Sequence, residues 1–132
     1  MIVAADGSGD FRSIQEAISQ IPDDNNERVT IYIKNGIYKE KLYINKHFVK
    51  LLGEDPEKTI LTYDDAAHKL LDNGEEMGTF RSYSTFIGGN DFIAENITFE
   101  NSAGPGDLVG QALAVYVNGD RAVFRNCRFL GH

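Results

Sequence analysis

The sequence predicts an all-β fold, and within that class it favours a parallel β-helix, or solenoid. Three observations support this prediction: one amphipathic helical segment near the start, a series of short apolar runs after it, and two matching segments 30 residues apart. Many short strands at close spacing are typical of sandwiches, barrels and solenoids alike. A repeat with a period of about 20 to 50 residues favours the solenoid.

The strongest helical pattern runs from Phe11 to Ile21 and predicts a helix at about 12–21. Apolar residues recur there at helical spacing, namely Phe11, Ile14, Ala17, Ile18 and Ile21. Ser13 and Glu16 have the spacing of a capping box, and Pro22 ends the pattern. In a solenoid, such a helix would cover the apolar end of the first coil.

The rest of the chain reads as short strands separated by turns. The apolar runs are 29–33, 41–44, 49–52, 60–62, 85–87, 92–94, 97–99, 112–117, 122–124 and 127–130. Turn residues lie between them, including Asn35-Gly36, Gly88-Gly89-Asn90 and Asn118-Gly119. Tyr83 and Phe86 lie in this part of the chain, and aromatic residues in strands more often belong to the core.

Two eight-residue segments, 92–99 and 122–129, match at an offset of 30 residues. The matching pairs are Asn96 with Asn126, Ile97 with Cys127, and Phe99 with Phe129. In a parallel β-helix the two phenylalanines would stack in the interior on successive coils. The two asparagines would lie at stacked turns, where asparagine tolerates a left-handed backbone. With only two copies of the repeat, an antiparallel sandwich stays open as an alternative.

Composition and charge restrict the classes of partner. The formal net charge is -7 and the pI is about 4.8, which argues against nucleic acid and against an anionic membrane surface. A neutral or esterified polymer would not be repelled. The single cysteine, Cys127, cannot form a disulfide within the chain and is expected to be a small buried apolar residue. The spacing of His, Cys and acidic residues suggests no metal site, and we expect no cofactor.

Six segments taken in series resemble pectin methylesterases, also called pectinesterases. They are Asp6–Ile18, Val29–Lys41, Gly78–Phe86, Phe92–Gly104, Gly110–Val117 and Gly119–Gly131. The resemblance implies a right-handed parallel β-helix with an N-terminal capping helix. It also implies that residues 1–132 are the N-terminal part of a single domain, truncated at its C-terminal end.

The resemblance implies hydrolysis of galacturonate methyl esters in pectin, which gives pectate and methanol. Members of the family use one aspartate as the nucleophile and another as the general acid, with a glutamine at the oxyanion. Two carboxylates with different pKa values can divide these roles. An amide N–H can stabilise the oxyanion without carrying a charge.

Two residues match functional positions of the family. Gln111 matches the oxyanion-stabilising glutamine and would also contact the substrate, and Thr79 matches a substrate-contacting threonine. Asp91, Asp107 and Asp120 match no catalytic position. We therefore expect the isolated chain to be inactive, because it lacks both catalytic aspartates.

The expected partner is pectin, or methyl-esterified polygalacturonate. A non-catalytic carbohydrate-binding or structural fragment is the alternative, and it would associate through an open end with itself or with a C-terminal half. A β-helical pectin lyase or hydrolase is disfavoured, since no acidic calcium-binding cluster is visible. Members of the family are typically secreted, but Met1 leads directly into the fold without a signal peptide, so the sequence does not indicate a compartment.

Overall fold

The computed structural model describes residues 1–64, 83–102 and 113–131. Within these ranges the chain forms one helix, α1 (Ile14–Ser19), and twelve strands in three sheets. Sheet A has the order β1 (Ile2–Val3), β2 (Val29–Ile33), β5 (Val49–Gly53), β8 (Phe92–Glu95), β11 (Ala122–Arg125). Sheet B has the order β3 (Gly36–Lys39), β6 (Thr59–Tyr63), β9 (Thr98–Asn101), β12 (Arg128–Leu130). Sheet C has the order β4 (Leu42–Ile44), β7 (Tyr83–Ile87), β10 (Leu113–Val117).

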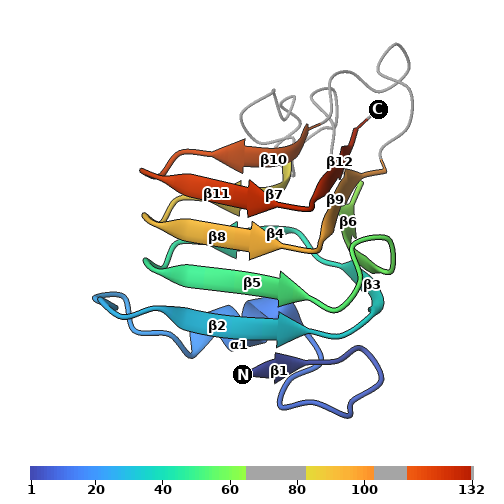
Figure 1. Cartoon of the computed structure of the whole chain (residues 1–132), viewed down its shortest axis with the longest axis horizontal. Helices are drawn as coiled ribbons and strands as arrows, with labels where there is room; N and C mark the ends of the chain where they lie inside the picture. Colours follow the sequence, from blue (N-terminus) through green and yellow to red (C-terminus); the bar gives the residue numbers. More distant parts are fainter. Residues whose placement is uncertain (65–82, 103–112, 132) are drawn as a thin grey trace, which may run out of the picture.

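Each coil of the chain passes through sheets A, B and C in turn and then rises to the next coil (Figure 1). All the strand pairs in the described ranges are parallel. The antiparallel sandwich is therefore wrong, and the chain is a right-handed parallel β-helix, the hand that parallel crossovers almost always take. No helix in the described ranges is long and apolar enough to cross a membrane.

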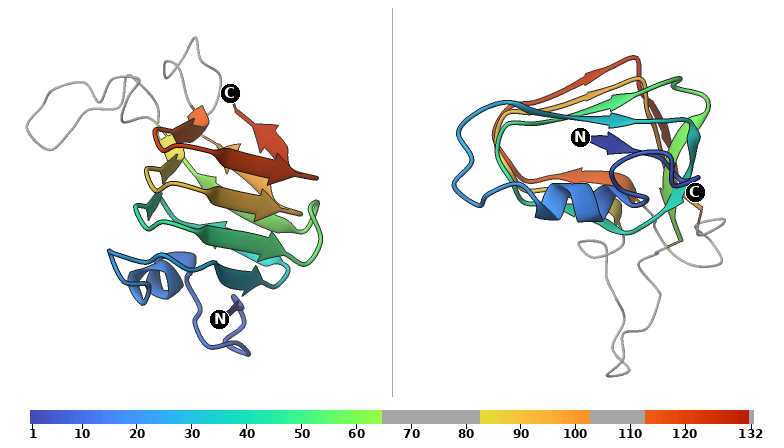
Figure 2. Two further views of the ribbon diagram at one scale, coloured as in Figure 1. Left: turned by 60° about the vertical axis from the view of Figure 1, so that its left-hand side comes forward. Right: turned by 90° about the horizontal axis from the view of Figure 1, so that it is seen from below.

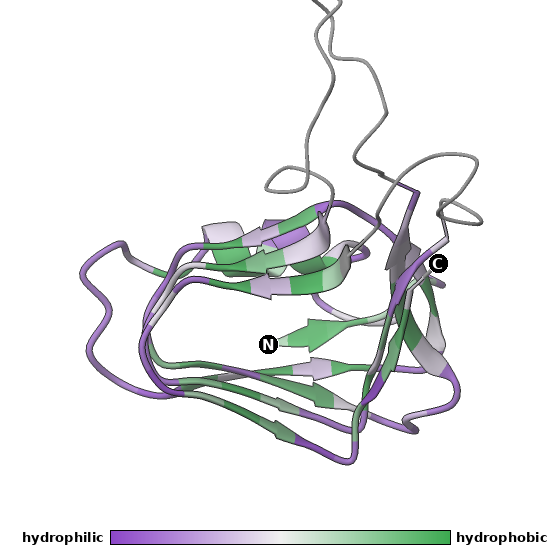
Figure 3. Ribbon diagram, turned by 90° about the horizontal axis from the view of Figure 1, so that it is seen from above, coloured by the Kyte–Doolittle hydropathy of each residue, from purple (hydrophilic) through white to green (hydrophobic). Residues whose placement is uncertain are grey.

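The core consists of columns of inward side chains that stack from coil to coil. In sheet A one column runs through Ile31, Leu51, Ala94 and Phe124. In sheet B another runs through Tyr38, Leu61, Phe99 and Phe129. Figure 3 shows that hydrophobic residues are concentrated in the strands, whereas the turns and loops between them are mainly hydrophilic. Burying one such side chain contributes about 1.5 to 3 kcal/mol, so the columns hold the coils together.

The 30-residue repeat is confirmed by the strand register. Asn96 and Asn126 have backbone φ angles of 59° and 54°, and Asn126 Nδ2 donates to Asn96 Oδ1 at 2.8 Å. The rings of Phe99 and Phe129 are stacked, with centroids 5.7 Å apart. Phe99 is fully buried, but Phe129 is 50% exposed, so the prediction that both are interior is wrong for Phe129. The reason is its place in the last coil, since no described strand pairs with β12 on its other side.

The helix is shorter than the predicted range of 12–21. Phe11 forms a parallel bridge with Val3 instead of a helical turn, and the helix begins after its N-cap, Ser13. Ser13 Oγ accepts the N–H of Glu16 at 3.1 Å, which confirms half of the predicted capping box. The helix ends at Gln20, its C-cap, two residues before Pro22.

Two side chains, Gln15 of α1 and Glu40 shortly before β4, hold α1 beneath β4, where sheet C begins (Figure 2). The carboxylate of Glu40 accepts the N–H groups of Ile14 and Gln15 at 2.9 and 3.0 Å. The Gln15 side chain accepts the Tyr43 N–H at 2.9 Å and donates to the Tyr43 carbonyl at 3.1 Å. One side-chain amide thus pairs with the lower edge of β4 as a neighbouring strand would.

The turns from sheet C to sheet A bring backbones into close contact, which explains their glycines. A Cβ on Gly89 would lie 1.9 Å from the Lys46 carbonyl oxygen, and one on Gly119 would lie 2.0 Å from the Gly89 carbonyl oxygen. Real Cβ atoms do not approach so closely, so only glycine permits this spacing of the coils.

We expect Thr85→Val to leave the free energy of unfolding unchanged or to raise it by about 1 kcal/mol. Thr85 points into the core from β7, is 1% exposed, and its hydroxyl has no hydrogen-bond partner within the described ranges. Thr98→Val is the matched control, because the buried Thr98 hydroxyl bonds both Pro56 and Arg128. Urea denaturation should show that the control loses stability. An equal loss of stability in both variants would show that the Thr85 hydroxyl does form a stabilising hydrogen bond.

We expect Gln15→Ala to lower the free energy of unfolding by about 1 to 2 kcal/mol, since it removes both bonds to the edge of β4. Gln20→Ala, at the exposed end of the same helix, should change it by less than about 0.5 kcal/mol. Thermal denaturation of both variants compares the edge contact with a general effect of alanine on the helix. Equal melting temperatures would show that the Gln15 amide does not stabilise the sheet.

Candidate functional site

The two residues expected at the site, Gln111 and Thr79, lie outside the described residues. Their places in the sequence still relate them to sheet C. Gln111 comes two residues before Leu113, where β10 begins, and Thr79 comes four residues before Tyr83, where β7 begins. Because β7 and β10 are neighbouring strands of sheet C, the outer face of this sheet is the candidate site.

An aromatic column, formed by Tyr43, Phe86 and Tyr116, follows the outer face of sheet C. One residue comes from each strand, in register. The Tyr43 and Phe86 rings are stacked with centroids 4.9 Å apart, and the Phe86 and Tyr116 rings with centroids 5.7 Å apart. Since these spacings match that of the coils, the rings stack on one another and direct mainly their edges outward. Tyr43 is 48% exposed.

A lysine and a tyrosine lie where β4 and β7 begin. Lys41 Nζ is 4.6 Å from the centroid of the Tyr83 ring, a cation–π contact. Tyr83 in turn touches Phe86, with ring centroids 5.5 Å apart. This end of the sheet therefore combines a positive charge with aromatic surface, and it is the end that Gln111 precedes in the chain.

A buried hydroxyl links the two strands that follow the predicted site residues. Ser84 Oγ donates to the Ala114 carbonyl oxygen at 2.7 Å, in addition to the backbone pairing of β7 with β10. Ala114 is the second residue of β10. The start of β10 is thereby held against β7 by a side chain as well as by the backbone hydrogen bonds between the two strands.

The described strands of sheet C contain no aspartate or glutamate. Asp91 and Asp120 lie in turns, as expected, and Asp107 lies outside the described residues. Asp91 accepts two hydrogen bonds from Arg121, which hold the pKa of its carboxyl below the usual range. A carboxylate held in this way is a poor proton donor, so the general-acid role does not suit Asp91.

Cys127 is partly buried rather than fully buried, and its burial raises the pKa of its thiol. A thiol of this kind is a weak nucleophile. Among the described residues no three His, Cys, Asp or Glu side chains are grouped as metal ligands. The outer face of sheet C is thus an aromatic and polar surface without its own reactive group in the described ranges.

The sequence does not single out Tyr43 and Tyr116 as surface residues, and it favours a core position for Phe86. A signal was present for the two tyrosines: each lies between two apolar residues of its strand, as Tyr43 does in Leu42–Ile44. Alternation of this kind places the middle residue on the opposite face from its neighbours. The runs were too short for this signal to be separated from that of a fully buried strand.

Comparison with known proteins gives one consistent family. A family profile described as Pectinesterase matches residues 1–132. Pectinesterase 31 of Arabidopsis thaliana is 45% identical, over 98% of this chain and 42% of its own length. A pectinesterase of Petunia integrifolia is 40% identical, over 98% of this chain and 33% of its own length.

Solved structures agree with the sequence relatives. Pectin methylesterase PemA from Erwinia chrysanthemi has a TM-score of 0.88 at 30% identity, covering 99% of this chain and 43% of that protein. The carrot pectin methylesterase has a TM-score of 0.80 at 36% identity, covering 96% of this chain and 38% of that protein. A pectin methylesterase solved in complex with a hexasaccharide has a TM-score of 0.85 at 31% identity, covering 96% of this chain and 41% of that protein. The chain spans less than half the length of these relatives, and it belongs to the pectinesterase family.

Proposed function

We propose that this chain forms part of the substrate site of a pectin methylesterase, which hydrolyses galacturonate methyl esters in pectin to pectate and methanol. The observation that supports the proposal is that the predicted site residues and the aromatic column are both related to sheet C. Both predicted site residues precede neighbouring strands of this sheet, and the aromatic column lies on the outer face of the same strands. Sugar rings bind well to surfaces that combine aromatic carbon with a few polar groups.

In this proposal Gln111 donates its side-chain N–H to the oxyanion that forms when the ester carbonyl is attacked. A neutral donor suits a polymer that already carries many carboxylates, because it gains most when negative charge develops on the ester oxygen. Thr79 contacts the sugar and so contributes to binding. Lys41 and Tyr83 lie at the same end of the sheet and favour an acidic sugar there.

The chain alone is proposed to be inactive. Ester hydrolysis by the family mechanism needs a nucleophilic carboxylate and a second carboxyl that protonates methoxide. The described strands of sheet C supply neither group, and the turn carboxylate of Asp91 is bound to Arg121. The catalytic pair would therefore come from a further part of the enzyme.

We expect no methanol from methyl-esterified pectin with the 132-residue chain alone. We expect hydrolysis from a chimaera in which this chain replaces the matching segment of Pectinesterase 31. In that chimaera Gln111→Ala should lower kcat about a hundredfold to a thousandfold, the usual cost of losing an oxyanion donor. Thr79→Ala should mainly raise KM, since its role is binding.

The control in the chimaera is Gln20→Ala, which changes an exposed residue at the end of α1. It should leave both kcat and KM unchanged. Methanol release by the isolated chain would contradict the proposed need for outside carboxylates. A Gln111→Ala chimaera with full kcat would contradict the role of Gln111.

A second candidate is a non-catalytic pectin-binding or structural role in which the chain associates through its last coil. The supporting observation is the set of exposed apolar side chains there, namely Val117, Val123, Phe129 and Leu130. A coil of the same repeat, from a second copy or from a separate C-terminal half, would pair with β10, β11 and β12. A folded chimaera that binds pectin but releases no methanol would favour this candidate over the first.

A further inference from the structure

The turns from sheet C to sheet A repeat an unusual backbone conformation. Phe48, Asp91 and Arg121 each precede a strand of sheet A, and their φ angles are 59°, 58° and 58°. Non-glycine residues rarely adopt positive φ, so each turn depends on contacts that hold it in place. The two later turns share one such contact, because Arg121 Nε and Nη2 bond the Asp91 carboxylate at 2.5 and 2.9 Å.

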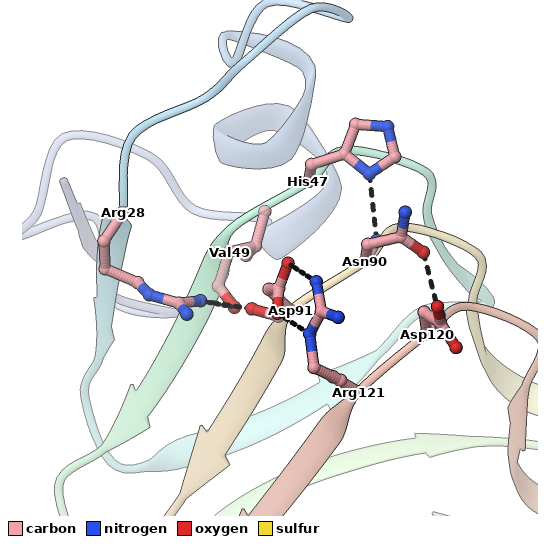
Figure 4. A network of polar contacts seen from close by, with 7 residues as sticks. All are labelled: Arg28, His47, Val49, Asn90, Asp91, Asp120 and Arg121. Atoms are coloured by element: carbon pink, nitrogen blue, oxygen red, sulfur yellow. Dashed lines mark hydrogen bonds and ion pairs between the residues drawn. The ribbon is translucent and has the colours of Figure 1, made fainter.

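The residues directly before these three positions, His47, Asn90 and Asp120, form a second column (Figure 4). In this column a side chain accepts the backbone N–H of the equivalent residue in the next coil. His47 Nδ1 accepts the Asn90 N–H at 2.9 Å. One coil further on, Asn90 Oδ1 accepts the Asp120 N–H at 2.8 Å. The same bond between coils is therefore made twice, once by an imidazole nitrogen and once by an amide oxygen.

These two acceptors differ in their response to protons. An amide oxygen accepts a hydrogen bond throughout the ordinary pH range, whereas an imidazole Nδ1 accepts only while it carries no hydrogen. We propose that His47 is a proton-sensitive latch between the coils of β5 and β8, closed while its imidazole is neutral and opened when Nδ1 takes up a proton.

The charged groups near His47 do not replace the hydrogen bond that is lost between the Asn90 N–H and His47 Nδ1. The loop before β2 brings Asp23, which pairs with Lys46 at 2.5 Å, and Arg28, which donates to the Asp91 carbonyl oxygen. The turn before β11 brings Asp120 and Arg121. Of these charged groups, the Asp91 carboxylate interacts electrostatically with His47, and Arg121 already holds that carboxylate through two hydrogen bonds (Figure 4). None of them provides a new acceptor at Nδ1 for the Asn90 N–H.

Opening the latch would act on the strand that carries Phe86. The turn that contains Asn90 begins directly after Ile87, the last residue of β7, and leads into β8. The Phe48 N–H also donates to the Asn90 carbonyl oxygen at 2.9 Å, so the two turns stay in contact through a backbone bond that does not titrate. We therefore expect local loosening of this turn on acidification rather than unfolding of the chain.

Amide hydrogen exchange of the 132-residue chain tests the latch, because Asn90 and Asp120 can be compared in one molecule. Protection factors relative to the unstructured chain remove the intrinsic pH dependence of exchange. From about pH 7.5 to about pH 5, which spans imidazole titration, the Asn90 N–H should lose about threefold to tenfold of its protection. The Asp120 N–H should keep its protection, since Arg121 holds the pKa of Asp91 below this range and Asn90 does not titrate.

The matched variant is His47→Asn, which copies the acceptor that Asn90 provides in the next coil. Its Asn90 protection should be the same at both pH values. Protection of Asn90 and Asp120 that falls together in the wild-type chain, or does not fall at all, would overturn the proposal. So would a nitrogen spectrum showing a hydrogen on His47 Nδ1 near pH 7.5. If His47→Asn fails to fold, the comparison within the wild-type chain still decides.

Discussion

The register of stacked coils is the constraint on which the rest of this structure depends. Each inward side chain lies directly above its equivalent in the coil below, as Phe129 lies above Phe99. A slip of one residue would turn every inward side chain outward, so burial of the core fixes the register strongly. The same register aligns the outer face, and it is the reason that Tyr43, Phe86 and Tyr116 form one column.

A stack of coils needs a start that does not leave a strand edge exposed. In sheet C this role belongs to α1, because Gln15 pairs with the edge of β4 and Glu40 accepts the first N–H groups of the helix. The first strand of the candidate site, β4, therefore packs on a helix that specific side chains hold in place. At the turns, close backbone approach at Gly89 and the bonds made by His47 and Asn90 keep the coils in step.

The sequence predicted the features that depend on local pattern. The helix was found from its apolar spacing and the repeat from Asn96 and Asn126, because both signals lie within short stretches. β3 was not predicted, since its inward residue is Tyr38 while the apolar Ile37 is 69% exposed, which reverses the usual pattern. The aromatic column and the Gln15 contact join residues far apart in the sequence, so only the folded register brings them together. The roles of Gln111 and Thr79 stay predictions from family resemblance.

Chemical-shift mapping with methyl-esterified hexagalacturonate tests most directly whether the outer face of sheet C binds pectin. We expect the largest amide and aromatic shifts on β4, β7 and β10, with Tyr43, Phe86 and Tyr116 among them. Shifts concentrated instead on the outer face of sheet A, around Tyr32 and Leu52, would contradict binding at sheet C and place the sugar surface elsewhere on the β-helix.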